Sequence, residues 1–136
     1  MKYHLLLPEG EQVGGAVDYY QWGAVLRSLS SLRAYKRLFH DNITPLSVGE
    51  LLILRPESPR SLASCYREID DVFTALRDIY RQDYECFRVA GEIHSRLRYS
   101  RIEDIFENGL HEFLEDFVTR NHALGRQISA DFMLRV

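Results

Sequence analysis

The chain has 136 residues, of which 46% are hydrophobic and 27% are charged, and its formal net charge is −3. This length fits one domain or a piece of one, and the apolar fraction excludes a wholly disordered chain. The slight acidic excess excludes a polycation that coats nucleic acid. Two cysteines are too few for a disulfide scaffold, and no apolar run approaches the ~18 residues of a membrane span. We therefore expect neither nucleic acid nor a membrane as a partner.

The first fifteen residues do not have a helical pattern. Residues 3–7 form a short apolar arm, and residues 8–15 contain the proline and glycines of a flexible connector. The apolar run after Lys2 stops at Pro8, which is too early for a secretory signal. We expect the arm to need a neighbour on which it can pack.

From residue 16 onward, apolar residues recur every three to four positions. This spacing predicts helices over 17–29, 32–39, 47–54, 60–80, a stretch from after residue 83 to residue 99, a short helix that ends at residue 108, and 110–134. No pair of strands with a hairpin turn appears in this region. The sequence therefore predicts an all-α fold for residues 16–136: an irregular helical bundle with three longer helices and several short capped ones.

Cap residues mark several of these predicted ends. Thr44–Pro45 and Ser58–Pro59 each place a hydroxyl before a proline, a combination typical of helix starts. Ser100 and Glu103 have the spacing of a capping box. Gly109 suits the left-handed position that ends a helix.

Aromatic residues and cysteines are interpreted first as core. Trp22 and the Tyr19–Tyr20 pair lie near the start of the first predicted helix, and we expect them to be buried. Cys65 and Cys86 lack a Cys-x-x-Cys partner or a base beside them, so we interpret both as small buried apolar residues.

Three potential metal ligands lie on the last two predicted helices. Glu107, His111 and Glu115 stand four residues apart and would share one face of a continuous helix. Gly109 breaks that helix, and the sequence contains no Glu-x-x-His, the motif of carboxylate-bridged di-iron bundles. The sequence therefore predicts no metal site and no cofactor.

The one basic cluster lies around the end of the helix that finishes at residue 99. Arg96, Arg98 and Arg101 are candidates for binding an anion or an acidic partner, with Arg88 nearby and Glu92 inside the cluster. The alternative is that these charges compensate the dipoles of the two helix ends.

Three stretches together resemble a known family. They are residues 2–8 followed by Gly14–Gly15, residues 41–61 from Asp-Asn-Ile-Thr-Pro to Pro-Arg-Ser, and residues 109–114, Gly-Leu-His-Glu-Phe-Leu. In this order and spacing the chain resembles the bacterial alpha-E domain family, a helical family of unknown function. The resemblance covers almost the whole chain, and we expect it to correspond to the C-terminal half of the family's usual length. It implies an all-helical cytoplasmic protein.

The resemblance also implies partners. Members of the family are typically encoded beside, or fused to, ATP-grasp-type peptide or amide ligases and transglutaminase-like proteins. The Glu-Arg motif to which the family's name refers is absent from this chain as a dipeptide. No functional residue of the family is therefore carried over.

Two hypotheses about function remain open at this point. In the first, the chain is a non-catalytic module that supports or docks a neighbouring ligase. In the second, it is part of an enzyme of amide or peptide synthesis whose site is completed by a missing N-terminal half, with Arg60, His111 and Glu112 as candidate catalytic residues. Because half of a helical domain leaves an apolar face uncovered, we also expect a homo-oligomer.

Overall fold

The computed structural model describes residues 16–40 and 42–133, with side chains from residue 19 onward. The predicted arm and connector of residues 1–15 lie outside the described residues. Within them the chain forms seven α-helices and one π-helical turn and no strand, so the all-α prediction is confirmed. The elements are α1 (Ala16–Ser28), α2 (Leu32–Phe39), α3 (Pro45–Gly49), η2 (Glu50–Leu54), α4 (Leu62–Tyr80), α5 (Glu85–Tyr99), α6 (Ile102–Asn108) and α7 (Leu110–Asp131).

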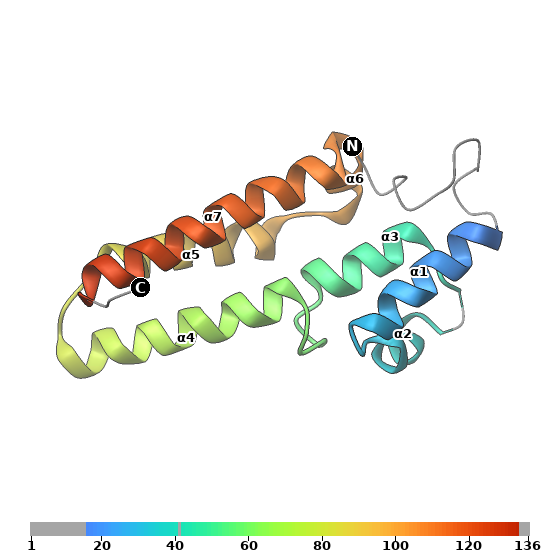
Figure 1. Cartoon of the computed structure of the whole chain (residues 1–136). Helices are drawn as coiled ribbons and strands as arrows, with labels where there is room; N and C mark the ends of the chain where they lie inside the picture. Colours follow the sequence, from blue (N-terminus) through green and yellow to red (C-terminus); the bar gives the residue numbers. More distant parts are fainter. Residues whose placement is uncertain (1–15, 41, 134–136) are drawn as a thin grey trace.

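The three longer helices α4, α5 and α7 form the body of the molecule (Figure 1). α4 and α5 are an antiparallel hairpin, and α7 returns antiparallel to α5, so that α4 and α7 run in the same direction. α1, α2, α3 and α6 gather at one end. This is the predicted bundle of three longer and several short helices.

The core lies around α5, because its apolar stripe faces both α4 and α7. All the predicted positions of this stripe, Phe87, Ala90, Ile93 and Leu97, are buried. The ring of Phe87 lies 4.9 Å from that of Phe73 on α4. Such offset ring pairs add to the free energy gained by burying the rings.

A buried tyrosine closes the end of the bundle near α2. Tyr35 is fully buried, and its hydroxyl donates a hydrogen bond of 2.5 Å to the backbone oxygen of Asn42. Two residues later, Thr44 Oγ1 accepts from the backbone N–H of Ser47 at 3.2 Å. The predicted cap at Thr44–Pro45 is therefore confirmed.

The segment from α3 through η2 is buried, as its apolar sequence predicts, but its geometry differs from a regular helix. The Arg55 N–H bonds to the carbonyl oxygen of Glu50 at 3.0 Å, which is the wider π-helical pattern. Gly49 packs directly against α6, since a Cβ there would lie 2.8 Å from Cε1 of Phe106. Only a glycine allows this approach.

Two predicted caps are wrong. Ser58 is buried in the preceding turn, and α4 instead begins after Ser61, whose Oγ accepts from the Ser64 N–H at 3.0 Å. Ser100 does not form a capping box with Glu103, because α6 begins one residue too late. The Ser100 hydroxyl instead donates to the Arg96 carbonyl oxygen at the end of α5.

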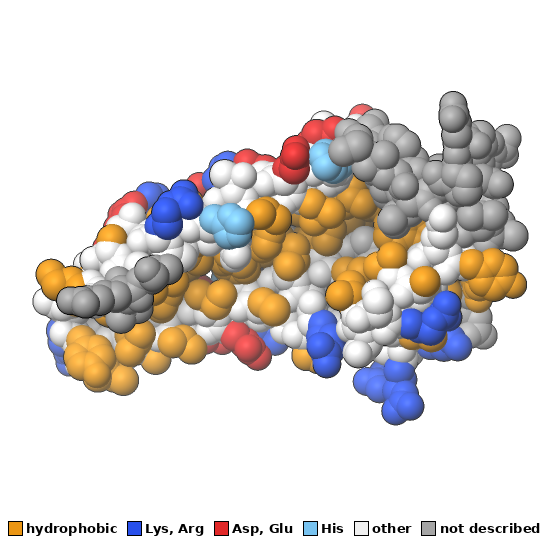
Figure 2. Space-filling view, viewed as in Figure 1, with side chains coloured by type: hydrophobic (Ala, Val, Ile, Leu, Met, Phe, Trp, Pro, Cys, Tyr) orange, Lys and Arg blue, Asp and Glu red, His pale blue; other side chains and the backbone are white. Residues whose placement is uncertain are grey.

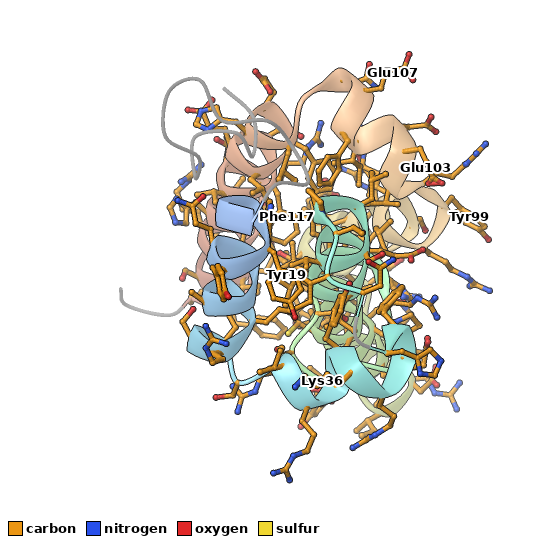
Figure 3. The ribbon with its side chains drawn as sticks, turned by 90° about the vertical axis from the view of Figure 1, so that its right-hand side faces the viewer. Tyr19, Lys36, Tyr99, Glu103, Glu107 and Phe117 are labelled. Carbon is orange, nitrogen blue, oxygen red and sulfur yellow. The ribbon has the colours of Figure 1, made fainter. Side chains whose placement is uncertain are left out.

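Three residues expected in the core are exposed. Tyr19 and Tyr20 are 44% and 68% exposed, whereas Trp22 is buried as predicted. Cys65 is exposed and only Cys86 is buried. The end view of Figure 3 shows the same contrast, because Phe117 points between the helices while Tyr99 lies at the periphery. Helical spacing identified apolar positions without showing which of them would be covered.

Candidate functional site

The three candidate catalytic residues occupy different surroundings. Arg60 is exposed in the turn before α4. His111 is half-buried in the first turn of α7, with Nε2 3.4 Å from Oε1 of Glu115 on the same helix. Glu112 is exposed and lines a surface hollow at the α5–α6–α7 junction. His111 lines a separate hollow on the outer side of α7, and Arg60 belongs to neither.

The hollow beside Glu112 has a volume of about 500 Å³ and mixed charge. Arg101 and Asp104 also line it, with Phe113 of α7 as an apolar wall. It therefore brings the predicted anion-binding residue Arg101 close to carboxylates, which compete with an external anion for the guanidinium.

The predicted basic cluster is largely neutralised by its own carboxylates. Glu92 lies within ion-pair distance of three guanidiniums: Arg88 at 3.3 Å, Arg96 at 3.6 Å and Arg120 at 3.8 Å. Arg120 comes from α7, and no local sequence signal indicates this contact because it joins residues far apart in the chain. Asp116 also pairs with Arg120, at 2.7 Å.

Two arginines of the cluster make further contacts within α5. The guanidinium of Arg98 lies 5.5 Å from the ring centroid of its neighbour Tyr99. Arg88 forms a hydrogen bond with Glu85 that lowers the pKa of the Glu85 carboxyl. The cluster thus links α5 to α7 through compensating charges, an arrangement that neither sequence-based interpretation of the cluster included.

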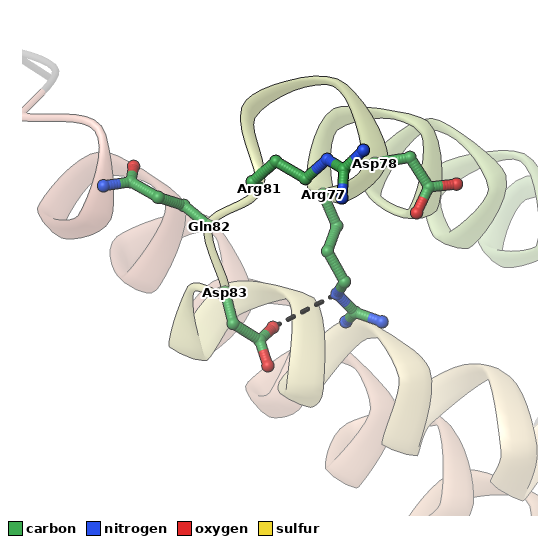
Figure 4. Close-up of a pocket in the computed structure, with 5 residues that line it drawn as sticks. All are labelled: Arg77, Asp78, Arg81, Gln82 and Asp83. Atoms are coloured by element: carbon green, nitrogen blue, oxygen red, sulfur yellow. Dashed lines mark ion pairs between the residues drawn. The ribbon is translucent and has the colours of Figure 1, made fainter.

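A polar turn between α4 and α5 forms another surface hollow (Figure 4). Arg77 reaches across it, with Nε 3.2 Å from Oδ1 of Asp83, while Asp78 points away. Arg81 adopts the left-handed conformation that ends α4. With two arginines and two aspartates, this turn carries no excess of either charge.

Two partly buried polar contacts tie α5 to its neighbours. Oδ2 of Asp131 accepts from the backbone N–H of Cys86 at 2.7 Å, at the positive end of the α5 dipole. This bond is the main cause of the lowered pKa of Asp131. Burial, with Asp131 beside it, raises the pKa of Cys86 to about 12 and keeps the thiol protonated and unreactive. On the other side of α5, Nδ1 of His94 lies 3.2 Å from Oδ2 of Asp70.

The largest unusual surface is an apolar face on α4 and α7, which we call the open face. It lies on the side of both helices that α5 does not cover, and Figure 2 shows a band of hydrophobic side chains there. Its members are Cys65, Ile69, Val72, Leu76 and Ile79 on α4, and Leu114, Val118, Gly125 and Ile128 on α7. Val72 is 56% exposed, Ile79 68% and Val118 50%.

Metal ligands do not assemble in the described part of the chain, where no group of three His, Cys, Asp or Glu side chains is placed to hold an ion. Gly109, with φ of 112°, separates α6 from α7 as predicted, so Glu107 is on a different helix from His111 and Glu115. Across the same residues, no helix combines the length and apolarity needed to cross a membrane.

For the described residues, these observations define an all-α helical domain with an apolar face on α4 and α7 that no other described helix covers. The chain belongs to the Alpha-E family, described as a predicted alpha-helical domain with a conserved ER motif, whose family model matches residues 1–133. The resemblance inferred from the sequence is thus confirmed.

The match takes in essentially the whole chain and is not limited to a C-terminal half of it. That residues 16–136 are the C-terminal part of a longer domain stays a prediction. No curated protein and no solved structure matches the chain.

Proposed function

We propose that this chain is a non-catalytic contact module that docks or supports an ATP-grasp-type peptide or amide ligase, or a transglutaminase-like protein, in the bacterial cytoplasm. The open face carries this proposal. Val72 and Ile79 of α4 and Leu114 and Val118 of α7 are exposed, with the partly buried Ile69, Leu76 and Ile128 beside them. An exposed apolar patch of this kind marks an interaction surface. The choice of partner rests on the family resemblance set out above.

The polar surroundings of the candidate catalytic residues support a contact role over an enzymatic one. A catalytic site needs polar groups that converge in one concave pocket. His111 and Glu112 are neighbours in sequence but line different hollows, and Arg60 lies in the turn before another helix.

The test is co-purification of the full-length protein with the ligase encoded beside it, followed by an assay of ATP-dependent amide formation. We expect the chain to be captured by the ligase, and capture to be lost on Val72→Asp but kept on Thr74→Asp. Thr74 is an exposed position of α4 outside the open face. The pair therefore introduces the same charge on the same helix at two different surfaces.

The enzymatic alternative makes the opposite prediction in the same assay. If the chain contributes catalytic groups, His111→Ala or Glu112→Gln would abolish amide formation without weakening capture. We expect both variants to retain full activity, and loss of activity with intact binding would contradict the contact role.

A further inference from the structure

The open face has the spacing of a helix-packing seam. On α4, residues 65, 69, 72, 76 and 79 follow alternating steps of four and three. On α7, residues 114, 118, 121, 125 and 128 do the same, with Asn121 as the polar position among them. This is the a/d pattern with which helices interdigitate side by side. Gly125 adds a small residue with open space above it, since no atom lies within 4 Å of a Cβ built there.

The two seams are held in a fixed relative register. The ring of Tyr66 on α4 lies 5.5 Å from that of Phe117 on α7, and its hydroxyl donates to Oδ1 of Asn121 at 2.5 Å. Because α4 and α7 run in the same direction, positions two residues further along each helix also lie at matching heights. Together the helices offer a rigid two-helix layer to an occupant.

We propose that a second copy of this chain covers the open face. A two-fold axis parallel to the helices would place α4 of one copy against α7 of the other. The two layers, each of two parallel helices, would then pack face to face as four parallel helices. This inference rests on the proposed contact role of the same face: the second copy covers the face in the free chain, and the ligase displaces that copy when it docks.

Charges at the borders of the face complement one another in this arrangement. On α4, Glu68 lies one turn before Val72, at the outer border of the seam. On α7, His122 lies one turn after Val118 at the corresponding border, and Arg126 follows one turn later. The Tyr66 register puts Glu68 at the height of residues 121–122, so the two-fold axis brings Glu68 opposite His122 and within reach of the long side chain of Arg126.

Glu115, the acidic residue on the same border of α7, does not repel Glu68 in this arrangement. Glu115 is two turns before His122, and its carboxylate already lies 3.4 Å from His111 of its own helix. The tyrosine register places Glu115 at the height of the start of α4, away from Glu68.

The size of the face bears on the strength of the dimer. From residue 65 to residue 79 the seam is about 21 Å long at a rise of about 1.5 Å per residue, and two helices are about 20 Å wide. Two such faces together bury about 840 Å² by this measure, which is below a standard-sized interface and is the size of a weak, reversible one. We therefore expect a weak dimer that dissociates on dilution.

The first test is the mass of the intact chain in solution between about 1 and 200 μM, by sedimentation equilibrium. We expect a monomer–dimer equilibrium in the wild type and in Thr74→Asp. Val72→Asp and Val118→Asp should raise the dissociation constant about 30-fold or more, because each buries a charge in an apolar contact. Circular dichroism of the same samples confirms that the variants are folded.

The second test is charge reversal, which examines the pairing of α4 with α7. Glu68→Arg and Arg126→Glu should each weaken the dimer about 5-fold, and the double variant should recover wild-type affinity. A double variant no tighter than the single variants would overturn this pairing. A wild-type chain that is monomeric at 200 μM would overturn the dimer itself, as would one that associates only after residues 1–15 are removed.

Capture by the ligase separates this inference from the proposed function. A monomeric chain that still binds the ligase through Val72 would refute the dimer and leave the contact role standing. A dimer that captures no ligase would refute the docking of the ligase and leave the dimer standing.

Discussion

α5 and the outer sides of α4 and α7 have similar apolar patterns but opposite surroundings. The stripe of α5, from Phe87 to Leu97, is buried because α4 and α7 pack on both sides of it. Val72 and Val118 continue equally regular stripes, yet both are at least half exposed. Apolar spacing along a helix therefore predicts that one face is to be buried. The number of neighbouring helices determines whether the same chain buries that face.

The largest expected effect contrasts two leucines from these two regions. Leu97→Ala removes a side chain that is 2% exposed, and it should lower the free energy of unfolding by about 2–5 kcal/mol. Leu114→Ala makes the same change at 38% exposure on the open face, and it should cost less than about 1 kcal/mol in dilute solution. Urea denaturation at low protein concentration measures both. Equal costs would show that the open face is packed within one chain.

Adding a methyl group at two glycines tests the same difference between a packed region and the open face. Gly49→Ala would push its Cβ against Phe106, and we expect a loss of about 1–2 kcal/mol despite the better helix propensity of alanine. Gly125→Ala meets no atom within 4 Å, and it should stabilise the chain by about 0.5–1 kcal/mol. Thermal unfolding of the two variants distinguishes them, and a stable Gly49→Ala would contradict the tight α3–α6 contact.

Alkaline pH should reveal the burial of Cys86. Its folded pKa is raised from 9.0 to about 12, so the unfolded state loses the thiol proton first, and stability falls as pH rises above 9. Between pH 9 and 10 the loss is about 1 kcal/mol for a shift of this size. Cys86→Ala should remove this slope, whereas Cys65→Ala, at the exposed cysteine, should keep it. Tyr66, whose pKa is raised by burial, adds its own loss from pH 10 upward.

The smallest expected effect appears in acid and concerns Asp131. Its pKa is lowered in the folded state, chiefly by the hydrogen bond from the Cys86 N–H, so its contribution is present above its ordinary pKa and is lost as pH falls through the folded value. Asp131→Asn should therefore make stability less dependent on pH below about 4. Unchanged acid unfolding would show that this carboxylate does not stabilise the start of α5.

Much of the fold could be predicted because its signals are local. The bounds of α2, the end of α4 at Tyr80, the end of α5 at Tyr99 and the break at Gly109 all follow from apolar spacing and turn residues. Thr44 caps α3 because its hydroxyl and Pro45 fit a helix start independently of the rest of the molecule.

Caps that compete with a neighbour could not be predicted in this way. Ser58 and Ser61 both precede α4, and tertiary packing buries Ser58 and leaves the cap to Ser61. Ser100 lies between α5 and α6, and its hydroxyl could bond to the end of either helix. Because α6 begins only at Ile102, the Ser100 hydroxyl bonds to the end of α5.

Surface chemistry was the least predictable feature, since it depends on contacts between distant segments. Arg96 was predicted to bind an anion, but both Arg96 and Arg120 of α7 lie within ion-pair distance of Glu92. Likewise, the π-helical turn at η2 and the exposure of Tyr20 have no local sequence signal that we could identify.

Thiol labelling reports directly whether a partner covers the open face in solution. In a Cys65→Ser background, Val72→Cys places a reactive thiol on the face and Thr74→Cys places one on the same helix outside it. We expect the labelling rate at residue 72 to fall several-fold between 1 and 200 μM protein, while the rate at residue 74 stays constant. Equal rates at residue 72 across that range would contradict the central claim.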